Sequence, residues 1–332
     1  MVELAWASRL TEAGWTAIIA AADGAALAQM PDDPRLRGGA GGVKRVLSAL
    51  GGIALAVLLL EAAIRPIYTL SLTYEPGIGY VNAPGIARWG QEGLASSTWE
   101  AHGARRTPGG TEGSESVLVL GDSFTEGLMV PDEAVFPAVA QAALDRQGVK
   151  LRLVNAGRST MAAADYVALA PRYRELFRPS WTVIALRSDD LGDDAWGDVA
   201  RTRFARDAEG NLVTRAVIPA ERAGLAGRLF ELRQRSMVLG YGAARVGRFR
   251  AAAAAEPPLF RASDPRPERS PPPVPPVEEE LDLVFHAYAD RASLLFLSST
   301  GTVEDPIEER ARRYCEARAR SCVFTRPSFL EL

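Results

Sequence analysis

The sequence predicts an α/β protein in which a parallel sheet is covered by helices on both faces and is preceded by one transmembrane helix. Three observations support this fold class. Residues 46–60 contain no charge, short apolar segments alternate with helical ones from residue 116 onward, and hydrophobic residues make up 47% of the 332-residue chain. A chain of this length and composition is expected to form a packed core.

The transmembrane helix is predicted at residues 45–65. Apolar character continues past Glu61 to Ile64, so the segment approaches the ~20 residues that span a hydrocarbon core. Basic residues before it favour a cytoplasmic N-terminus and an exported remainder, as in a single-pass protein of the cell membrane: Arg35, Arg37, Lys44 and Arg45. We expect an uncleaved anchor. The alternative is a buried helix of a soluble domain.

Two segments flank this anchor. Residues 1–44 form the predicted cytoplasmic segment, which starts with the pattern of an Ala-rich amphipathic helix over residues 1–29. We hypothesise that Met30 is the true start, because the residues after it form a short basic leader for the anchor. Residues 66–115 form a leader segment rich in Gly, Pro and Trp, a composition that favours irregular structure or short strands.

The third part of the chain, residues 116–332, shows a β-α-β-α-β alternation. Strands are predicted at 116–120, 151–155 and 181–186, with helices at 134–147 and 161–177. Strands joined through helices lie parallel and are covered on both faces. The pattern therefore predicts a three-layer α/β/α domain with a parallel, flavodoxin-like sheet.

An insert at residues 198–276 interrupts the alternation. It holds a hairpin turn at 208–211, a basic helical stretch at 224–255 and a Pro-rich connector. The insert either shapes the mouth of a pocket or binds a partner. The alternation then resumes with two helices and two strands, at 277–292, 293–298, 304–320 and 322–325.

Composition narrows the chemistry. A net charge of −3 gives no reason to expect nucleic acid as a partner. His102 and His286 are the two histidines, too few for a multi-histidine metal site, and we expect neither a metal nor a cofactor. Cys315 and Cys322 lack zinc-motif spacing. They form one disulfide if the domain is exported, or remain two unpaired small residues.

The strongest signal is an apolar strand that leads directly into Gly-Asp-Ser-Phe-Thr-Glu-Gly at 121–127. Ser123 then lies at the carboxyl end of a parallel strand, where such sheets bind ligands. A helix that starts there favours negative charge, such as the oxyanion formed when a serine attacks an ester. Ser123 is therefore a candidate nucleophile. A lone Gly-Asp-Ser can also be a simple helix-capping turn.

This motif resembles the first block of the SGNH (GDSL-type) hydrolases. Residues 155–160, Asn-Ala-Gly-Arg-Ser-Thr, resemble the second block, and residues 188–191, Ser-Asp-Asp-Leu, stand where the third block has Gly-Asn-Asp-Leu. Leader residues 76–80 and 102–105 resemble the segment before the domain in membrane-anchored bacterial members. The resemblance implies a Ser-His-Asp mechanism in which serine attacks an ester and backbone N–H groups with an asparagine amide hold the oxyanion.

The resemblance assigns an oxyanion hole to Ser123, Thr160 and Asp189, the last two at the family's glycine and asparagine positions. A β-carbon restricts the loop at Thr160. The carboxylate of Asp189 has no N–H to donate and repels an oxyanion unless it is protonated. Loss of one such donor typically costs ~10²-fold in turnover. Substrate contacts are expected from three further residues, Asp122, Gly157 and Arg158.

The family's fourth block, Asp-x-x-His, is absent from this sequence. We expect neither histidine to replace it, because His286 lies in an apolar-periodic helix and His102 in a Gly/Arg-rich loop. That loop reaches the site only if the leader folds over the sheet edge. Aspartates after the third strand indicate a solvated helix start more than a cation site: Asp189, Asp190, Asp193 and Asp194.

Three interpretations share this fold. The first is an exported esterase that hydrolyses or transfers O-acyl or acetyl groups, with envelope or exported polysaccharide as substrate by analogy. The second is a catalytically inactive binding module, and the third is a truncated product that lacks the catalytic histidine. The sequence contains no phosphate-loop motif and no dinucleotide-binding pattern. Oligomeric state is not encoded in any of these motifs.

Overall fold

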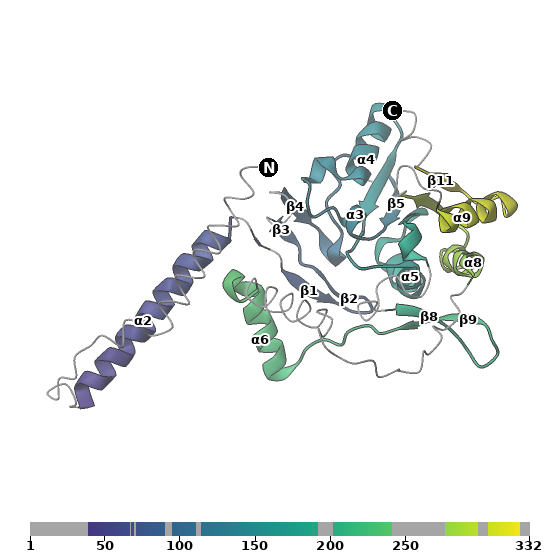
Figure 1. Ribbon diagram of the computed structural model, residues 1–332. Helices are drawn as coiled ribbons and strands as arrows, with labels where there is room; N and C mark the ends of the chain where they lie inside the picture. Colours follow the sequence, from purple (N-terminus) through teal and green to yellow (C-terminus); the bar gives the residue numbers. More distant parts are fainter. Residues whose placement is uncertain are drawn as a thin grey trace. The chain divides into compact units, whose positions relative to one another are not determined.

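The computed structural model describes residues 39–66, 68–69, 71–89, 95–110, 114–191, 202–240, 276–297 and 305–325. Contacts divide the chain into two units, residues 1–59 and 60–332 (Figure 1). Several sequence predictions lie outside the described residues: the helix at 1–29, the start at Met30, the pair Asp193 and Asp194, and most of the Pro-rich connector.

The first unit contains most of helix α2 (Gly39–Ile64), in which Leu47–Ile64 has a mean hydropathy of 2.2 and is long and apolar enough to cross a membrane. Its large apolar side chains are exposed, for example Leu50 and Leu58. Leu47–Ile64 is therefore a candidate membrane span by its length and composition.

The second unit is built on five parallel strands: β5 (Glu115–Leu120), β6 (Leu151–Asn155), β7 (Trp181–Leu186), β10 (Ala292–Phe296) and β11 (Cys322–Phe324). Their order across the sheet is β11-β10-β7-β5-β6, and every neighbouring pair is parallel. Counted along the chain, this is the flavodoxin-like order 2-1-3-4-5. The predicted fold class is confirmed.

Helices cover both faces of the sheet. One face packs against α5 (Ala163–Phe177), α8 (Val277–Ala287) and α9 (Pro306–Ala317), which lie in a row (Figure 1). The other face packs against α4 (Phe136–Arg146).

Side chains alternate along each strand between the two helical layers. In β5, Leu118 and Leu120 belong to the core beneath α5 and α8, whereas Val117 and Val119 belong to the core beneath α4. Because both faces are covered, such a strand is a continuous apolar run rather than an alternation of apolar and polar residues.

The leader segment forms two antiparallel hairpins, as its composition predicted. They consist of β1 (Leu72–Glu75) with β2 (Gly79–Asn82), and of β3 (Gly85–Trp89) with β4 (Ala95–Trp99). Arg105 then forms a bridge with Asn155 at the end of β6. The leader therefore borders the edge of the parallel sheet next to β6.

The described part of the insert begins with a hairpin, β8 (Thr202–Arg206) and β9 (Leu212–Ala216), as predicted. The basic helical stretch predicted from residue 224 is helical in its described part, with α6 (Gly224–Arg235), a break at Ser236 and helical residues at 237–240. The Ser236 hydroxyl accepts from Leu239 N (3.2 Å) and starts a separate helical turn. This side-chain cap explains the break.

The strands and helices of the α/β alternation appear where the sequence predicts them, with ends that shift by a few residues. The predicted helix at 134–147 starts at Phe136, after a 3₁₀ turn at Asp132–Ala134. The sequence left open whether the two cysteines pair. In the structure, Cys315 near the end of α9 is disulfide-bonded to Cys322 in β11. The bond ties the last described strand to the helix before it.

Candidate active site

The candidate nucleophile lies at the carboxyl end of β5. Ser123 is the first residue of the short helix α3 (Ser123–Glu126), and Asp122 caps this helix by accepting from Phe124 N (2.9 Å). Ser123 is half-buried, and its hydroxyl has no hydrogen-bond partner among the described residues. A β-carbon at Gly121 would lie 1.8 Å from the Thr125 hydroxyl, so this turn requires glycine.

The loop after β6 packs directly against the turn at residues 121–127, which carries the candidate nucleophile Ser123 and is called the nucleophile turn below. Arg158 N donates to Gly121 O (2.9 Å), and Asn155 Nδ2 donates to Thr125 O (2.8 Å). A β-carbon at Gly157 would lie 2.6 Å from Glu126 N, so glycine permits this close approach. The first and second motif blocks are therefore side by side.

Two predicted site residues in this loop differ in what they can offer a ligand. Gly157 is buried and its N–H donates to Asn155 Oδ1 (3.0 Å), so its amide is already occupied. Arg158 carries two buried guanidinium atoms, Nε and Nη1, without a partner among the described residues. These donors are available to an oxygen-rich ligand.

Thr160 has a left-handed backbone with φ 70°. For a β-branched residue this conformation costs about 1–2 kcal/mol, which a glycine at this position avoids. The Thr160 amide has no acceptor among the described residues, so it remains a donor for a ligand. The sequence predicted a restricted loop here, and the structure shows the restriction as a positive φ.

The loop after β7 also faces the nucleophile turn. The Arg187 guanidinium lies over the Phe124 ring, 4.8 Å from its centroid, and pairs with Asp189 (2.9 Å). Asp189 stands at the position where the related motif has asparagine. Its carboxylate is held by a cation and offers no N–H to a ligand.

Asp190 corrects the prediction of a solvated helix start after the third strand. Its side chain is buried, and 2% of its surface is exposed. Its Oδ2 accepts from Arg187 N (2.8 Å), while Oδ1 has no partner among the described residues. Burial raises the pKa of Asp190 to about 8, and the charges of Asp122 and Asp189 add to the rise. The described residues contain no group of side chains suited to a metal ion.

Two neighbours share this environment. Burial also raises the pKa of Asp122, against the opposing effects of its bond from Phe124 N and of the Arg187 charge. Tyr166 on α5 is fully buried, and its hydroxyl has no partner among the described residues. Burial raises the pKa of Tyr166 well above its ordinary value, and the charges of Asp190 and Asp122 act in the same direction.

His102 interacts with Glu75 and Phe177 and has no contact with Ser123 among the interactions of the described residues. Its Nδ1 is 2.8 Å from Glu75 Oε2, and its ring contacts the Phe177 ring edge-on at 6.0 Å between centroids. Phe177 ends α5, which has 15 residues and is therefore about 22 Å long. α5 starts beside the site and ends near the start of β7. The His102 ring thus contacts the end of α5, while Arg105, three residues later, bonds to the turn that carries Ser123.

His286 lies at the end of the sheet opposite to Ser123. It is the next-to-last residue of α8 and is exposed, shortly before β10 begins at Ala292. Since β10 runs parallel to the strand before Ser123, its start is at the far end of the sheet. The expectation that neither histidine serves Ser123 stays a prediction.

Sequence reasoning missed the side chains that hold the nucleophile turn from the leader side. Glu126 is buried and accepts from Asn82 Nδ2 (2.8 Å), from Ser159 N (2.9 Å) and from the Ser159 hydroxyl. Arg105, also buried, donates to the carbonyls of Glu126 and Gly127. Glu126 and Arg105 can be recognised in the sequence as charged residues, but the groups that they bind lie far away along the chain.

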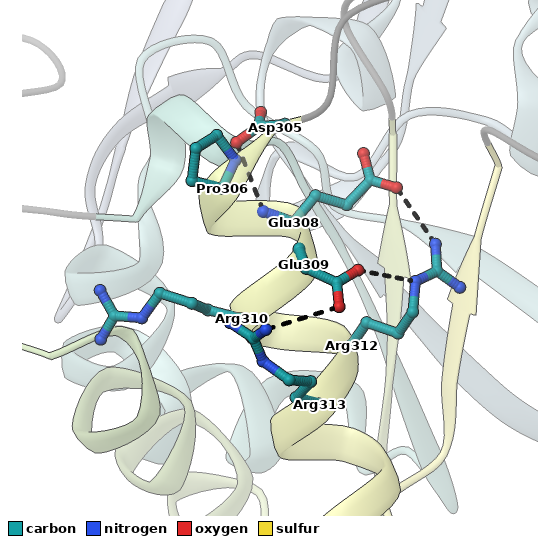
Figure 2. A pocket seen from close by; sticks show the side chains of 7 residues that line it. All are labelled: Asp305, Pro306, Glu308, Glu309, Arg310, Arg312 and Arg313. Atoms are coloured by element: carbon teal, nitrogen blue, oxygen red, sulfur yellow. Dashed lines mark hydrogen bonds and ion pairs between the residues drawn. The ribbon is translucent and has the colours of Figure 1, made fainter.

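A large cavity lies elsewhere, at the start of α9. It has a volume of 790 Å³ and is lined by a row of mainly charged side chains (Figure 2): Asp305, Pro306, Glu308, Glu309, Arg310, Arg312 and Arg313. Arg312 pairs with Glu308 (3.3 Å), and Arg313 pairs with Glu309 (3.8 Å). These charges are largely satisfied within the helix, so the convergent loops around Ser123 remain the stronger candidate site.

Comparisons with known proteins identify similar structures only. No family model and no curated protein sequence matches the chain. AlinE4, described as an SGNH-hydrolase family esterase, is 12% identical with a TM-score of 0.30, over 64% of this chain and 77% of that one. TesA is 16% identical with a TM-score of 0.29, over 63% and 77% of the two chains.

A third similar structure is the psychrotrophic esterase EstA from Pseudoalteromonas sp., which is 10% identical with a TM-score of 0.32. It matches 63% of this chain and 76% of its own. At TM-scores of this size, function has to be inferred from the geometry around Ser123. The solved structures to which this chain is similar thus include esterases of the SGNH-hydrolase family.

Proposed function

We propose that this chain is a serine hydrolase of ester bonds with Ser123 as its nucleophile. One observation carries the proposal: three loops, after β5, β6 and β7, converge on a half-buried serine at the point where the strand order reverses. The contacts Arg158 N to Gly121 O and Arg187 over Phe124 hold these loops together.

The chemistry follows from the groups around the serine. Ser123 Oγ attacks the carbonyl carbon of an ester, and the amides of Ser123 and Thr160 stabilise the oxyanion. The alcohol leaves with a proton, and water then hydrolyses the acyl-enzyme. His286 lies at the far end of the sheet and His102 is paired with Glu75, so a carboxylate of the third loop, Asp189, is the proposed proton acceptor. A carboxylate is a weaker base than histidine, and slow turnover is expected.

The proposed location is the exported face of the cell membrane, with residues 45–65 as anchor and the N-terminus cytoplasmic. Two features support it: the basic residues before the apolar segment, and the disulfide between Cys315 and Cys322, a bond that persists in oxidising compartments. The proposed substrate is an O-acyl or acetyl ester on exported carbohydrate, which the sequence resemblance supports by analogy.

A second candidate function is an inactive binding module of the same fold. The observation in its favour is that Asp189 replaces the asparagine donor and is paired with Arg187, while His102 is paired with Glu75. In that case the unpartnered guanidinium atoms of Arg158 contribute to binding an acylated ligand without cleaving it.

Labelling of the serine distinguishes the two functions. The detergent-solubilised full chain is incubated with a fluorophosphonate probe and, separately, with p-nitrophenyl acetate, beside Ser123→Ala and Ser96→Ala. Ser96 is an exposed residue of β4 and provides a matched control. We expect labelling and hydrolysis by the wild type and the control, and neither by Ser123→Ala. Equal signals in all three proteins, or no labelling of the wild type, would contradict catalysis by Ser123.

A further inference from the structure

Helix α6 exposes leucines where a surface helix normally places polar residues. Leu225, Leu229 and Leu232 have 73%, 57% and 52% of their surface exposed. Their spacing of four and three residues puts them on one face of the helix. Helices of soluble proteins usually turn such a stripe toward the core.

The opposite face of α6 attaches the helix to the β1–β2 hairpin. The Phe230 ring packs on Tyr80, with 4.7 Å between centroids, and Gln234 Oε1 accepts from Leu72 N (3.0 Å). Gly227 on the same face is buried. The leucine stripe is therefore turned away from the domain by contacts that hold the helix in this orientation.

Basic residues border the leucine stripe on both sides. At 100° per residue, Arg228 and Arg235 lie on one flank of the stripe and Arg233 on the other. Glu231 is the one acidic residue of α6. Leucines flanked by arginines are the pattern of a helix that lies in the boundary between lipid headgroups and acyl chains, where arginines contact phosphates.

The C-terminal end of α6 is tied to the end of the apolar helix. The Glu61 carboxylate accepts from Met237 N (3.0 Å), from Val238 N (3.2 Å) and from the Ser236 hydroxyl. Arg65 Nη2 donates to Arg235 O (3.4 Å). Glu61 is the first charged residue after the charge-free run, so the hydrocarbon core is expected to end near it. The end of α6 is thereby held beside the residue at which the charge-free run ends.

We propose that α6 is a second membrane contact, with Leu225, Leu229 and Leu232 inserted at the interface of a bilayer that contains anionic phospholipids. The occupant of the leucine face is the membrane rather than another protein, because arginines border the stripe and Glu61 and Arg65 fix the end of α6 where the anchor ends. The inference rests on the proposed anchor at residues 45–65 and is independent of catalysis by Ser123.

The test measures lipid contact at single positions of the full chain. Leu229→Cys is labelled with the environment-sensitive dye NBD after reconstitution into phosphatidylcholine vesicles with phosphatidylglycerol. The native cysteines are joined in a disulfide, so the dye reacts at the introduced thiol. Leu55→Cys reports on the anchor, and Glu316→Cys on α9, at an exposed position, serves as the aqueous control.

At position 229 we expect a blue-shifted emission that is quenched by lipids brominated near the headgroup. At position 55 we expect quenching by lipids brominated deep in the acyl chains. The control at 316 should show neither. Quenching at 55 but not at 229 would overturn the inference and leave the anchor intact. Absence of quenching at both positions would overturn the anchor, and the inference with it.

A charge variant tests the role of the arginines. In the Leu229→Cys background, Arg228→Gln with Arg233→Gln should reduce the blue shift and the quenching in vesicles that contain phosphatidylglycerol. With the wild-type arginines, the blue shift and the quenching should decrease in the same way at high salt, because salt screens the attraction to the anionic surface. Unchanged quenching of the variant in anionic vesicles would contradict the assigned role of the arginines.

Discussion

Asp190 shows how a single buried carboxyl gives the site a pH-dependent character. Its Oδ1 and the Tyr166 hydroxyl have no partners among the described residues, and burial raises the pKa of both groups. With a pKa of about 8, Asp190 is mostly neutral at pH 7. The negative charge beside the nucleophile turn is therefore smaller than the acidic sequence of this loop suggests.

This carboxyl predicts how stability depends on pH. In the folded state its pKa is about 8 instead of the ordinary 3.8. Folding thus favours the protonated form, whose stabilising contribution is full below pH 3.8 and is lost as the pH rises through 8. Asp190→Asn keeps a neutral side chain of the same shape. We expect it to reduce, by a few kcal/mol, the loss of unfolding free energy between pH 5 and 9, at ~1.4 kcal/mol per pKa unit.

Thermal unfolding in detergent, followed by circular dichroism at both pH values, measures this effect. Asp189→Asn is the matched control, because Asp189 is partly exposed and paired with Arg187. It removes a charge that adds to the rise at Asp190, so it should reduce the pH dependence by less than Asp190→Asn does. If Asp190→Asn lost stability with rising pH as steeply as the wild type, Asp190 would not be the group responsible.

The sequence predicts only part of this residue-scale detail. Strand ends and glycine turns identify Ser123 and the loops near it, because these depend on local pattern. Burial of Asp190 and the positive φ of Thr160 depend on how the loops after β6 and β7 pack together. A single carboxylate after a strand looks the same in the sequence whether it faces water or the core.

At the scale of elements, the leader segment is part of the site's support. Arg105 is fully buried and bonds to Asp132 (3.0 Å) and to the Val130 carbonyl (2.6 Å), besides the carbonyls at the end of α3. It thereby joins the hairpins of the leader to the turn that carries Ser123. The sequence indicated short strands here but not this connection, because the partners are 21 to 27 residues apart.

Removal of this guanidinium is expected to loosen the turn after α3. Arg105→Met removes one donor from Asp132 and one from each of three carbonyls, and loss of one partner of a buried ion pair costs about 3–5 kcal/mol. Arg105→Lys retains the charge but not the planar guanidinium, so its stability should be intermediate between those of the wild type and Arg105→Met. The midpoint of thermal unfolding and proteolysis between residues 127 and 132 measure the effect.

The control for this prediction is Arg152→Met. Arg152 pairs with Glu100 at 3.3 Å, and both side chains are about half exposed, so its loss should cost at most about 1 kcal/mol. Similar destabilisation by Arg105→Met and Arg152→Met would show that Arg105 contributes no more than a surface ion pair.

At the scale of the whole molecule, the order of elements was the most predictable property. Each strand of the α/β alternation contains a short apolar run, and each following helix has its own periodicity, so both can be identified locally. The position of α6 was not predictable, since it depends on Phe230 against Tyr80 and on Glu61 at the end of another helix. Such contacts join distant parts of the sequence.

The proposed membrane anchor predicts how the whole chain fractionates. The Leu47–Ile64 segment, with a mean hydropathy of 2.2, should hold the protein in the membrane pellet through high-salt washing and release it only with detergent. Leu55→Arg places a charge near the middle of the segment, which costs about 2.5–3.5 kcal/mol on insertion scales. The variant should show a larger soluble or degraded fraction. Recovery of the wild type in the salt wash would contradict the anchor.

The bond between Cys315 and Cys322 has a consequence for the order in which the domain matures. Thiols stay reduced in the cytosol, so on the proposed route this bond forms only after the chain has crossed the membrane. Before then, β11 is held mainly by three paired positions with β10, from Leu294↔Cys322 to Phe296↔Phe324. The sheet edge is thus expected to close last, once an oxidant outside the cytoplasm has accepted the electrons of the two thiols.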